Sequence, residues 1–249
     1  MIVEFIGSTG AGKTSLISKI HHKLAQTKVV TTPFDLIATP LGLSSIIHPT
    51  AQNLIQELIG FPFFIGSLYR HGKFLSHTIE TFSRNTKFSI YRINNLRSLE
   101  RKIGVYEITQ RYYKDQIILV DEGPILAAHM FVFTGSLVTS SEIATFADLV
   151  PLPDLIVYIK APVDVLVRRA LQRPDPPREM GNKDPVRAEK YVKDATTIFD
   201  QLMGSERIRS RVLIVDNPDL TAEEHDRLAD DVTTSILAHE RTASKMHKI

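Results

Sequence analysis

A glycine-rich segment near the start of the chain has the residue types and spacing of a loop that binds phosphate. Residues 7–14 read Gly-Ser-Thr-Gly-Ala-Gly-Lys-Thr, a full match to G-x-x-x-x-G-K-[ST]. Its glycines let the backbone curl so that N–H groups point at phosphate oxygens. Lys13 can reach the β- and γ-phosphates of a nucleotide, and the Thr14 hydroxyl can ligate Mg²⁺. The predicted nucleotide-phosphate site comprises Gly7, Ser8, Thr9, Gly10, Ala11, Gly12, Lys13, Thr14 and Ser15.

Two acids follow a later apolar segment, at residues 117–120. Asp121 ends this segment and Glu122 comes next. An acid at the end of an apolar strand can ligate Mg²⁺ or anchor a metal-bound water, or it can cap the turn that follows. Glu122 is either a second carboxylate on the metal side or a turn residue. We predict Thr14 and Asp121 as the metal-site residues.

The elements that must position these residues alternate between strands and helices. Apolar segments of strand type occupy residues 1–6, 28–32, 117–120, 154–160 and 211–215. Helical patterns occupy residues 15–26, 124–133, 162–171 and 185–203, and a capping box at 221–224 begins a last helix, with a frayed tail expected from Arg241. This alternation predicts a mainly parallel sheet with helices on both faces. The loops after the strands, at 7–14, 33–35, 121–124, 160–164 and 216–218, should share one edge of that sheet.

The segment between the second and third predicted strands is long and lacks a strand pattern. Residues 34–116 show helical periodicity at 43–59, 63–84 and 91–113, broken at Leu41-Gly42 and at 60–62. We expect a helical insertion within a single domain that spans residues 1–249. Its aromatic run at 61–64 packs in the core or lines a pocket, and its Arg70 or Arg97 is either solvated or holds a phosphate of an acceptor.

Composition excludes several other classes of function. The chain has 249 residues, 43% of them hydrophobic, and a net charge of +2, too small to argue for a nucleic-acid polymer or a membrane surface as partner. The absence of cysteine excludes disulfides and thiolate zinc sites, and the histidines show no metal-ligand spacing. No apolar run has transmembrane length, and the first strand leaves no room for a signal peptide, so we expect a cytoplasmic protein.

The order of these features resembles the P-loop kinases of nucleosides and nucleoside monophosphates, particularly the thymidylate kinase and deoxynucleoside kinase branch. The resemblance covers nearly the whole chain. It rests on residues 7–14, on Asp121-Glu122-Gly123, on Pro-Asp-Leu-Ile-Val-Tyr-Ile-Lys-Ala-Pro at 153–162, and on the arginines that follow. It implies an α/β, three-layer P-loop NTPase fold with a five-stranded parallel sheet, helices on both faces, an acceptor-side insertion at 34–116 and an arginine-rich lid at 168–190.

The resemblance also implies roles for single residues. ATP with Mg²⁺ would be the phosphoryl donor, and Asn217 and Pro218 would border its adenine. A lid guanidinium would stabilise charge on the transferring phosphoryl group; the lid candidates are Arg168, Arg169, Arg173 and Arg178. The implied catalytic residues are Lys13, Asp121, Arg169, Arg173 and Asp35, and Arg169 would also contact the nucleotide.

The acceptor side departs from the pattern of this family. The family's arginine after the third strand is replaced by Glu122-Gly123, and its Glu-Pro after the second strand is replaced by Thr32-Pro33. Asp35 could supply the missing carboxylate, or it could form a turn. Either Asp35 or Glu122 would then orient the attacking hydroxyl.

We therefore expect a Mg-ATP-dependent phosphotransferase that acts on a small-molecule acceptor, most plausibly a nucleoside or nucleoside monophosphate, and that could form a homodimer. Two alternatives stay open: a P-loop NTPase with a regulatory or conformational role, and a nucleotide-binding module without kinase activity. A GTPase is disfavoured, because residues 159–164 lack the Asn/Thr-Lys-x-Asp guanine motif.

Overall fold

The structure is a computed structural model that describes residues 1–46, 48–85, 90–112, 116–174, 176–177, 180 and 183–246. Its centre is a five-stranded sheet in the order β2-β3-β1-β4-β5, and every paired strand is parallel to its neighbour. The strands are β1 (Ile2–Ile6), β2 (Val30–Thr31), β3 (Ile117–Val120), β4 (Leu155–Lys160) and β5 (Val212–Asp216).

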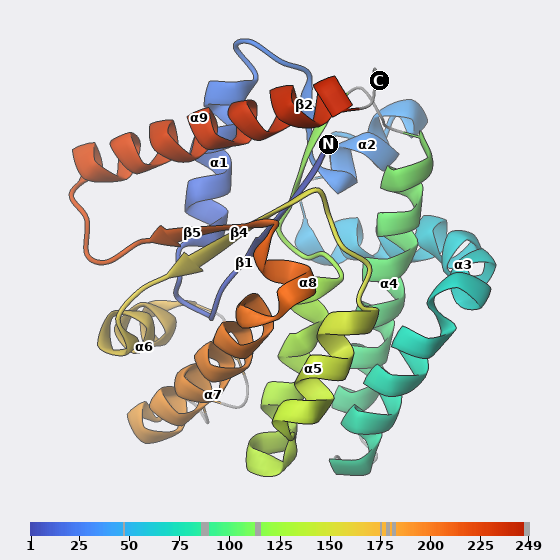
Figure 1. Ribbon diagram of the computed structural model, residues 1–249, viewed down its shortest axis with the longest axis vertical. Helices are drawn as coiled ribbons and strands as arrows, with labels where there is room; N and C mark the ends of the chain where they lie inside the picture. The colour runs from blue at the N-terminus through green and yellow to red at the C-terminus, as the bar shows by residue number, and fades with distance from the viewer. Residues whose placement is uncertain are drawn as a thin grey trace.

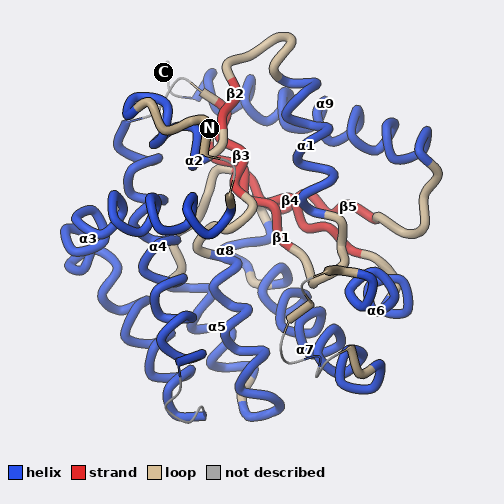
Figure 2. Tube along the Cα trace, turned by 180° about the vertical axis from the view of Figure 1, so that it is seen from behind, coloured by secondary structure: helices blue, strands red, loops and turns tan. Residues whose placement is uncertain are grey.

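Helices cover both faces of this sheet, as predicted. Figure 2 shows the sheet between α1 and α9 on one side and α4, α5 and α7 on the other. The central strands β1 and β3 are buried along their whole length, which explains why they read as unbroken apolar runs rather than as alternating patterns. The helices on the two faces include α1 (Lys13–Leu24), α4 (Ile90–Tyr112), α5 (Ser140–Leu149), α6 (Val163–Gln172), α7 (Pro185–Gly204), α8 (Glu206–Arg209) and α9 (Ala222–Met246).

The insertion between β2 and β3 is helical, but two of its predicted helices are joined into one. One helix, α3 (Pro49–Asn85), runs for 37 residues through Gly60 and Pro62, where the sequence predicted a break. Pro62 is tolerated because the carbonyl left without its hydrogen bond, that of Leu58, lies on an exposed residue and can be hydrated. Gly60 packs against α4, where a Cβ built on Gly104 would lie 2.4 Å from the Gly60 carbonyl oxygen.

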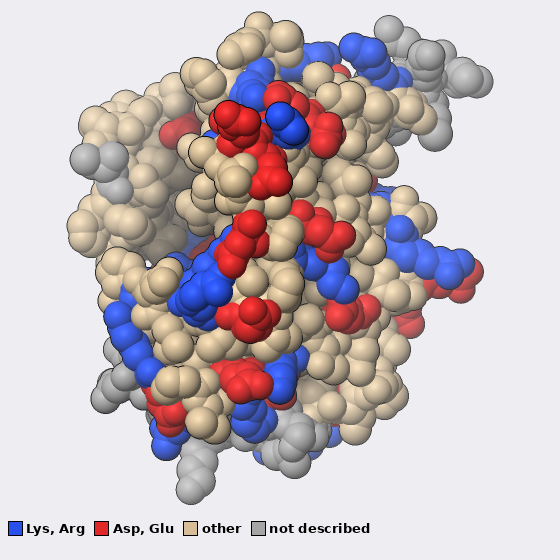
Figure 3. All heavy atoms as spheres, turned by 90° about the vertical axis from the view of Figure 1, so that its left-hand side faces the viewer, with Lys and Arg blue, Asp and Glu red and all other residues tan. Residues whose placement is uncertain are grey.

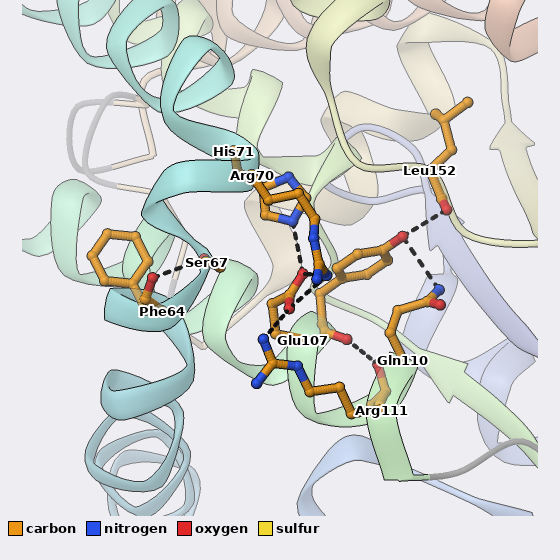
Figure 4. Close-up of polar contacts among 10 residues, drawn as sticks. Phe64, Ser67, Arg70, His71, Glu107, Gln110, Arg111 and Leu152 are labelled. Carbon is orange, nitrogen blue, oxygen red and sulfur yellow. Dashed lines mark hydrogen bonds and ion pairs between the residues drawn. The ribbon is translucent and has the colours of Figure 1, made fainter.

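A buried carboxylate joins α3 to α4 below this crossing. Arg70 and His71 of α3 both reach the carboxylate of Glu107 on α4, at 3.0 and 2.8 Å, and Arg111 approaches it from the next turn at 3.2 Å (Figure 4). The Tyr106 hydroxyl donates to the Leu152 carbonyl oxygen at 2.9 Å and so ties α4 to the segment before β4. Because Glu107 is fully buried, its carboxylate needs these partners, and they hold the two helices in one register.

Other elements also differ from the sequence prediction. A short helix α2 (Pro33–Ala38) follows β2 and continues into η1 (Thr39–Leu41), and α5 begins at a capping box between Thr139 and Glu142 that the prediction overlooked. The segment after Pro124 forms a 3₁₀ helix, η2 (Ile125–Leu137). The tail expected from Arg241 is helical as far as Met246. No helix in the described part of the chain is long and apolar enough to span a membrane.

Candidate active site

The loop between β1 and α1 is shaped by contacts with other segments, including α6 and the loop after β5. Gly10 and Gly12 both have φ of 87°, a backbone conformation that favours glycine. A Cβ on Gly10 would lie 2.4 Å from the Leu166 carbonyl oxygen of α6, and a Cβ on Gly12 would lie 2.5 Å from the Asn217 side chain. Gly12 immediately precedes the first turn of α1, and the N–H groups of that turn have no partner within the helix. The loop can therefore bind an anion through backbone N–H groups at a helix N-terminus.

The side chains of Lys13 and Thr14, the first two residues of α1, lie near the end of β3. The Lys13 ammonium donates to the carbonyl oxygens of Gly7 and Ser8, at 2.8 and 3.4 Å. Thr14 Oγ1 donates to Asp121 Oδ2 at 3.1 Å, which joins the ends of β1 and β3. Burial lowers the pKa of Lys13 and raises that of Asp121, while each charge partly offsets the burial of the other. This adjacent hydroxyl and carboxylate are the oxygen ligands that Mg²⁺ prefers.

The loop after β5 is attached to the glycine-rich loop and to α6. Asn217 is buried, and its side-chain amide donates to the Ala11 carbonyl oxygen at 2.7 Å. Arg169 donates to the carbonyl oxygens of Asn217 and Pro218, at 3.0 and 2.6 Å. Arg169 therefore fixes the position of this loop, in addition to facing the cavity described next.

A cavity of about 700 Å³ lies beyond the strand ends. One wall is the glycine-rich loop from Thr9 to Ser15, together with Arg169 and Arg173 of the α6 region. The opposite wall comes from α4, and the floor from Asp121, Glu122 and the first turns of η2. The α4 and η2 residues that line the cavity are Asn95, Ser98, Leu99, Arg101, Lys102, Leu126, Ala127, His129 and Met130. The cavity thus has two halves, one at the loop and one at α4. They are named the donor half and the acceptor half after the roles that the sequence predicts for them.

The acceptor half is organised around an ion cluster. Arg101 Nη2 lies 2.7 Å from Glu122 Oε2, and the Lys102 ammonium lies 3.6 Å from the same oxygen. Lys102 also donates to Ser98 Oγ at 2.6 Å. The nearby Lys102 charge, with that of Arg101, lowers the pKa of Glu122 to about 2, so Glu122 is a carboxylate at neutral pH. Glu122 is therefore more than a turn residue.

A second acid lies behind this cluster, in β1. Glu4 is almost completely buried, and its Oε1 accepts a hydrogen bond from the Leu126 N–H at 2.9 Å. Burial raises its pKa to about 8. A Cβ on Gly123 would lie 2.4 Å from the Glu4 carboxyl carbon, so a side chain at position 123 would collide with Glu4. Position 123 therefore requires glycine, and Arg101 and Lys102, from α4, supply positive charge on this side of the cavity.

Burial also sets the protonation state of His129 in η2. The ring stacks on Phe199 at 5.7 Å between centroids, and Tyr191 contacts Nδ1 at 3.2 Å. Burial, with the nearby charges of Lys13 and Lys102, lowers its pKa to about 3, so the ring is neutral in the physiological range. His129 therefore adds a polar but uncharged surface to the floor of the cavity.

The structure brings some of the predicted site residues together and leaves others apart. Residues 9–15, Asp121, Glu122, Arg169 and Arg173 line one cavity. Asp35 is not among its lining residues; it lies in the first turn of α2, where the Thr32 hydroxyl donates to its carboxylate at 2.7 Å. Arg178 lies outside the described residues.

The two arginines considered for an acceptor phosphate have other partners. Arg97 makes a two-pronged contact with Glu57 of α3, at 2.6 and 2.8 Å, and Arg70 binds Glu107. Neither lines the cavity. Five lining residues were not singled out from the sequence: Asn95, Ser98, Arg101, Lys102 and His129. Their position every three or four residues along one helix is the signal that could have grouped 95, 98, 101 and 102.

A parallel sheet in this order, a glycine-rich loop opening α1, and an acid after the neighbouring strand define a P-loop fold with the layout of small-molecule kinases. No family model matches the sequence, and no curated protein sequence matches it significantly.

Solved structures do match this fold. The chain is similar to a deoxyadenosine kinase from M. mycoides with the products dCMP and dCDP bound, with 14% identity and a TM-score of 0.50, over 95% of this chain and 100% of that one. The same kinase with dATP matches at 13% identity and a TM-score of 0.49, over 94% and 100% of the chains. A shikimate kinase from Acinetobacter baumannii matches at 15% identity and 0.42, over 95% and 93%. The first of these similarities confirms the predicted resemblance at the level of the fold.

Proposed function

We propose that this protein transfers the γ-phosphoryl group of Mg·ATP to a small-molecule acceptor, with nucleosides and nucleoside monophosphates as the first acceptors to test. The observation that carries this proposal is the single cavity that joins the glycine-rich loop to a polar wall on α4. A phosphoryl transferase needs both a donor site and an acceptor site within one enclosed space, because in-line transfer requires the two substrates to be adjacent.

The donor half would bind the phosphates of ATP. Residues 9–15 supply backbone N–H groups, and Lys13 is close enough to the cavity to exchange its carbonyl partners for phosphate oxygens. Thr14 and Asp121 would hold Mg²⁺, which neutralises charge on the β- and γ-phosphates when bound. The buried, unpartnered Ser8 Oγ and Asn217 Oδ1 support the presence of a polar ligand or ordered water at this loop.

Two arginines of the predicted lid, Arg169 and Arg173, would have different roles. Arg169 is a positioning residue, because it holds the loop after β5 against α6. Arg173 lies at the end of α6 and lines the cavity, and its charge acts on both Lys13 and Asp121. Arg173 is thus the better candidate to stabilise charge on the transferring phosphoryl group.

The acceptor half would bind and orient the hydroxyl or phosphate that attacks. Glu122 is ionised and fixed by Arg101 and Lys102, so it can accept a hydrogen bond from an attacking hydroxyl without moving. Because phosphoryl transfer passes through a loose transition state, this orientation matters more than proton abstraction by a strong base. We assign the orienting role to Glu122 rather than to Asp35, because Glu122 lines the cavity and Asp35 lies in the first turn of α2, bound to the N-cap residue Thr32.

One experiment separates this proposal from its two rivals. ADP release from Mg·ATP is measured with and without a panel of nucleosides, nucleoside monophosphates, shikimate-like polyols and sugars. Release that depends on one acceptor class supports the kinase. Release that needs no acceptor supports a regulatory NTPase, and ATP binding without turnover supports a binding module; either result contradicts the proposal.

A further inference from the structure

The outer face of α3 is apolar and is not covered by any other described part of the chain. Six large side chains on this face are between 41% and 102% exposed. They are Leu54, Leu58, Phe61, Ile65, Leu68 and Tyr69. Figures 1 and 2 place α3 at the outer edge of the molecule, beyond α4. The six side chains are called the α3 stripe here.

The face formed by α1 and α9 shows how an ordinary exposed surface of this protein differs. There Lys19 pairs with Asp226 and Lys23 pairs with Asp230, and acidic and basic side chains lie beside one another over the molecule's left-hand side (Figure 3). On α3, by contrast, no charged residue lies between Glu57 and Arg70. A continuous uncharged, apolar face of this kind marks an interaction site.

The spacing of the α3 stripe is that of a helix-pairing seam. From Leu54 to Leu68 its members recur at intervals of four, three, four and three residues, the pattern in which apolar side chains face a partner helix. A glycine, Gly66, borders this face, and a Cβ built there would meet nothing within 4 Å. Glycine weakens a helix interior, and no contact within the described chain requires it at this position. A second helix packed closely on this face would give a reason for it.

We propose that the α3 stripe is the interface of a two-fold dimer, in which the α3 helices of two copies pair antiparallel with their crossing near residue 63. In this pairing Leu58 faces Leu68 of the other copy, and Phe61 faces Ile65 and Gly66. A two-fold arrangement of this kind buries the same stripe on both copies and closes the assembly at two chains.

The exposed area agrees with such an interface. The six side chains expose on the order of 600 Å² in each copy, at the upper limit of what a monomer ordinarily exposes in one apolar patch. Two copies, with the polar residues at the rim, reach the roughly 1,200 Å² at which specific interfaces begin. Burial of the stripe would also support α4, which packs on the inner side of α3 and forms the acceptor wall.

Single cysteines test the direction of pairing, because the natural chain contains none. In the antiparallel dimer the two copies of residue 65 lie roughly 6 Å apart along the helix axis, whereas those of residue 54 lie roughly 27 Å apart. We expect Ile65→Cys to form a disulfide-linked dimer under mild oxidation and Leu54→Cys to stay uncrosslinked. Equal crosslinking of both variants, or of neither, would overturn the proposal.

Sedimentation measures the dimer itself. The wild-type chain should sediment at twice its 28.0 kDa mass at micromolar concentration. The double variant Phe61→Glu/Ile65→Glu should sediment as a monomer while keeping its helical circular dichroism. Ile79→Glu is the matched control: Ile79 is 37% exposed on the same helix, but its counterpart in the pairing would be residue 47, before α3 begins. A monomeric wild type would contradict the proposal, and so would dissociation of the dimer by Ile79→Glu. The proposal would also be contradicted if the wild type bound phosphatidylcholine vesicles and the double variant did not.

Discussion

The two halves of the cavity are built from different kinds of sequence. The donor half is one continuous segment, residues 9–15, with Asp121 and the α6 arginines added. The acceptor half collects single side chains from α4, η2 and the end of β3, and Arg101 and Glu122 meet from positions 21 residues apart. The donor half depends on backbone N–H groups and so tolerates little variation in shape, whereas the acceptor half depends on side chains that can change with the substrate. This difference explains why the sequence alone predicts the nucleotide-binding loop but does not predict the acceptor site.

The largest effect should come from the donor half. Lys13→Ala removes the ammonium that we propose to bind the β- and γ-phosphates, and we expect phosphoryl transfer to fall by about 10³-fold or more. Acceptor-dependent ADP release measures this. Lys19→Ala, on the same helix but paired with Asp226, should stay within about twofold of the wild type. An active Lys13→Ala variant would contradict the proposed role of the donor half in binding ATP.

The acceptor half should give a smaller and more selective loss. Glu122→Gln keeps the shape but removes the charge that faces Arg101 and Lys102, so we expect kcat/KM for the acceptor to fall by about 10–10²-fold with little change in the KM for ATP. Glu57→Gln is the control, because Glu57 binds Arg97 in a similar pair outside the cavity. If both variants lose activity equally, the effect is structural rather than local to the acceptor site.

Glu4, behind the acceptor half, should make stability depend on pH. Its pKa is raised from 4.5 to about 8, so between these values the folded state holds a proton that the unfolded state has released. The free energy of unfolding should therefore decrease as pH rises through this range, by at most about 1.4 kcal/mol per unit. Urea unfolding of the wild type and Glu4→Gln at pH 5.5 and 8 measures this. The wild type should lose stability relative to the variant at the higher pH; parallel curves would contradict the assignment.

The smallest effect concerns a residue that the structure places in neither half. Asp35→Ala should leave kcat/KM within about twofold, because the Asp35 carboxylate does not line the cavity. It should lower the free energy of unfolding by about 1 kcal/mol, because Asp35 interacts with the N-cap residue Thr32 in the first turn of α2. Thermal unfolding and acceptor-dependent ADP release are the two measurements. A large loss of activity would return the catalytic role to Asp35.

Local patterns determined most of the fold. The buried strands of the sheet read directly as short apolar runs, and the alternation of strand and helix fixed a parallel sheet with both faces covered. Helix boundaries were less predictable where tertiary contacts outweighed local signals. Gly60 and Pro62 indicate a break, but α3 continues because the Gly60–Gly104 contact and the buried Glu107 hold it against α4.

For the site, the sequence by itself determined the donor loop, since Gly10, Gly12, Lys13 and Thr14 form a contiguous motif whose chemistry depends on local geometry. Only the tertiary structure decided the partners of the arginines. Each of the three arginines binds a different carboxylate: Arg97 binds Glu57, Arg101 binds Glu122 at the cavity, and Arg70 binds the buried Glu107. Which carboxylate each arginine meets depends on how α4 packs between α3 and the sheet, and such long-range packing leaves no signature in a local pattern.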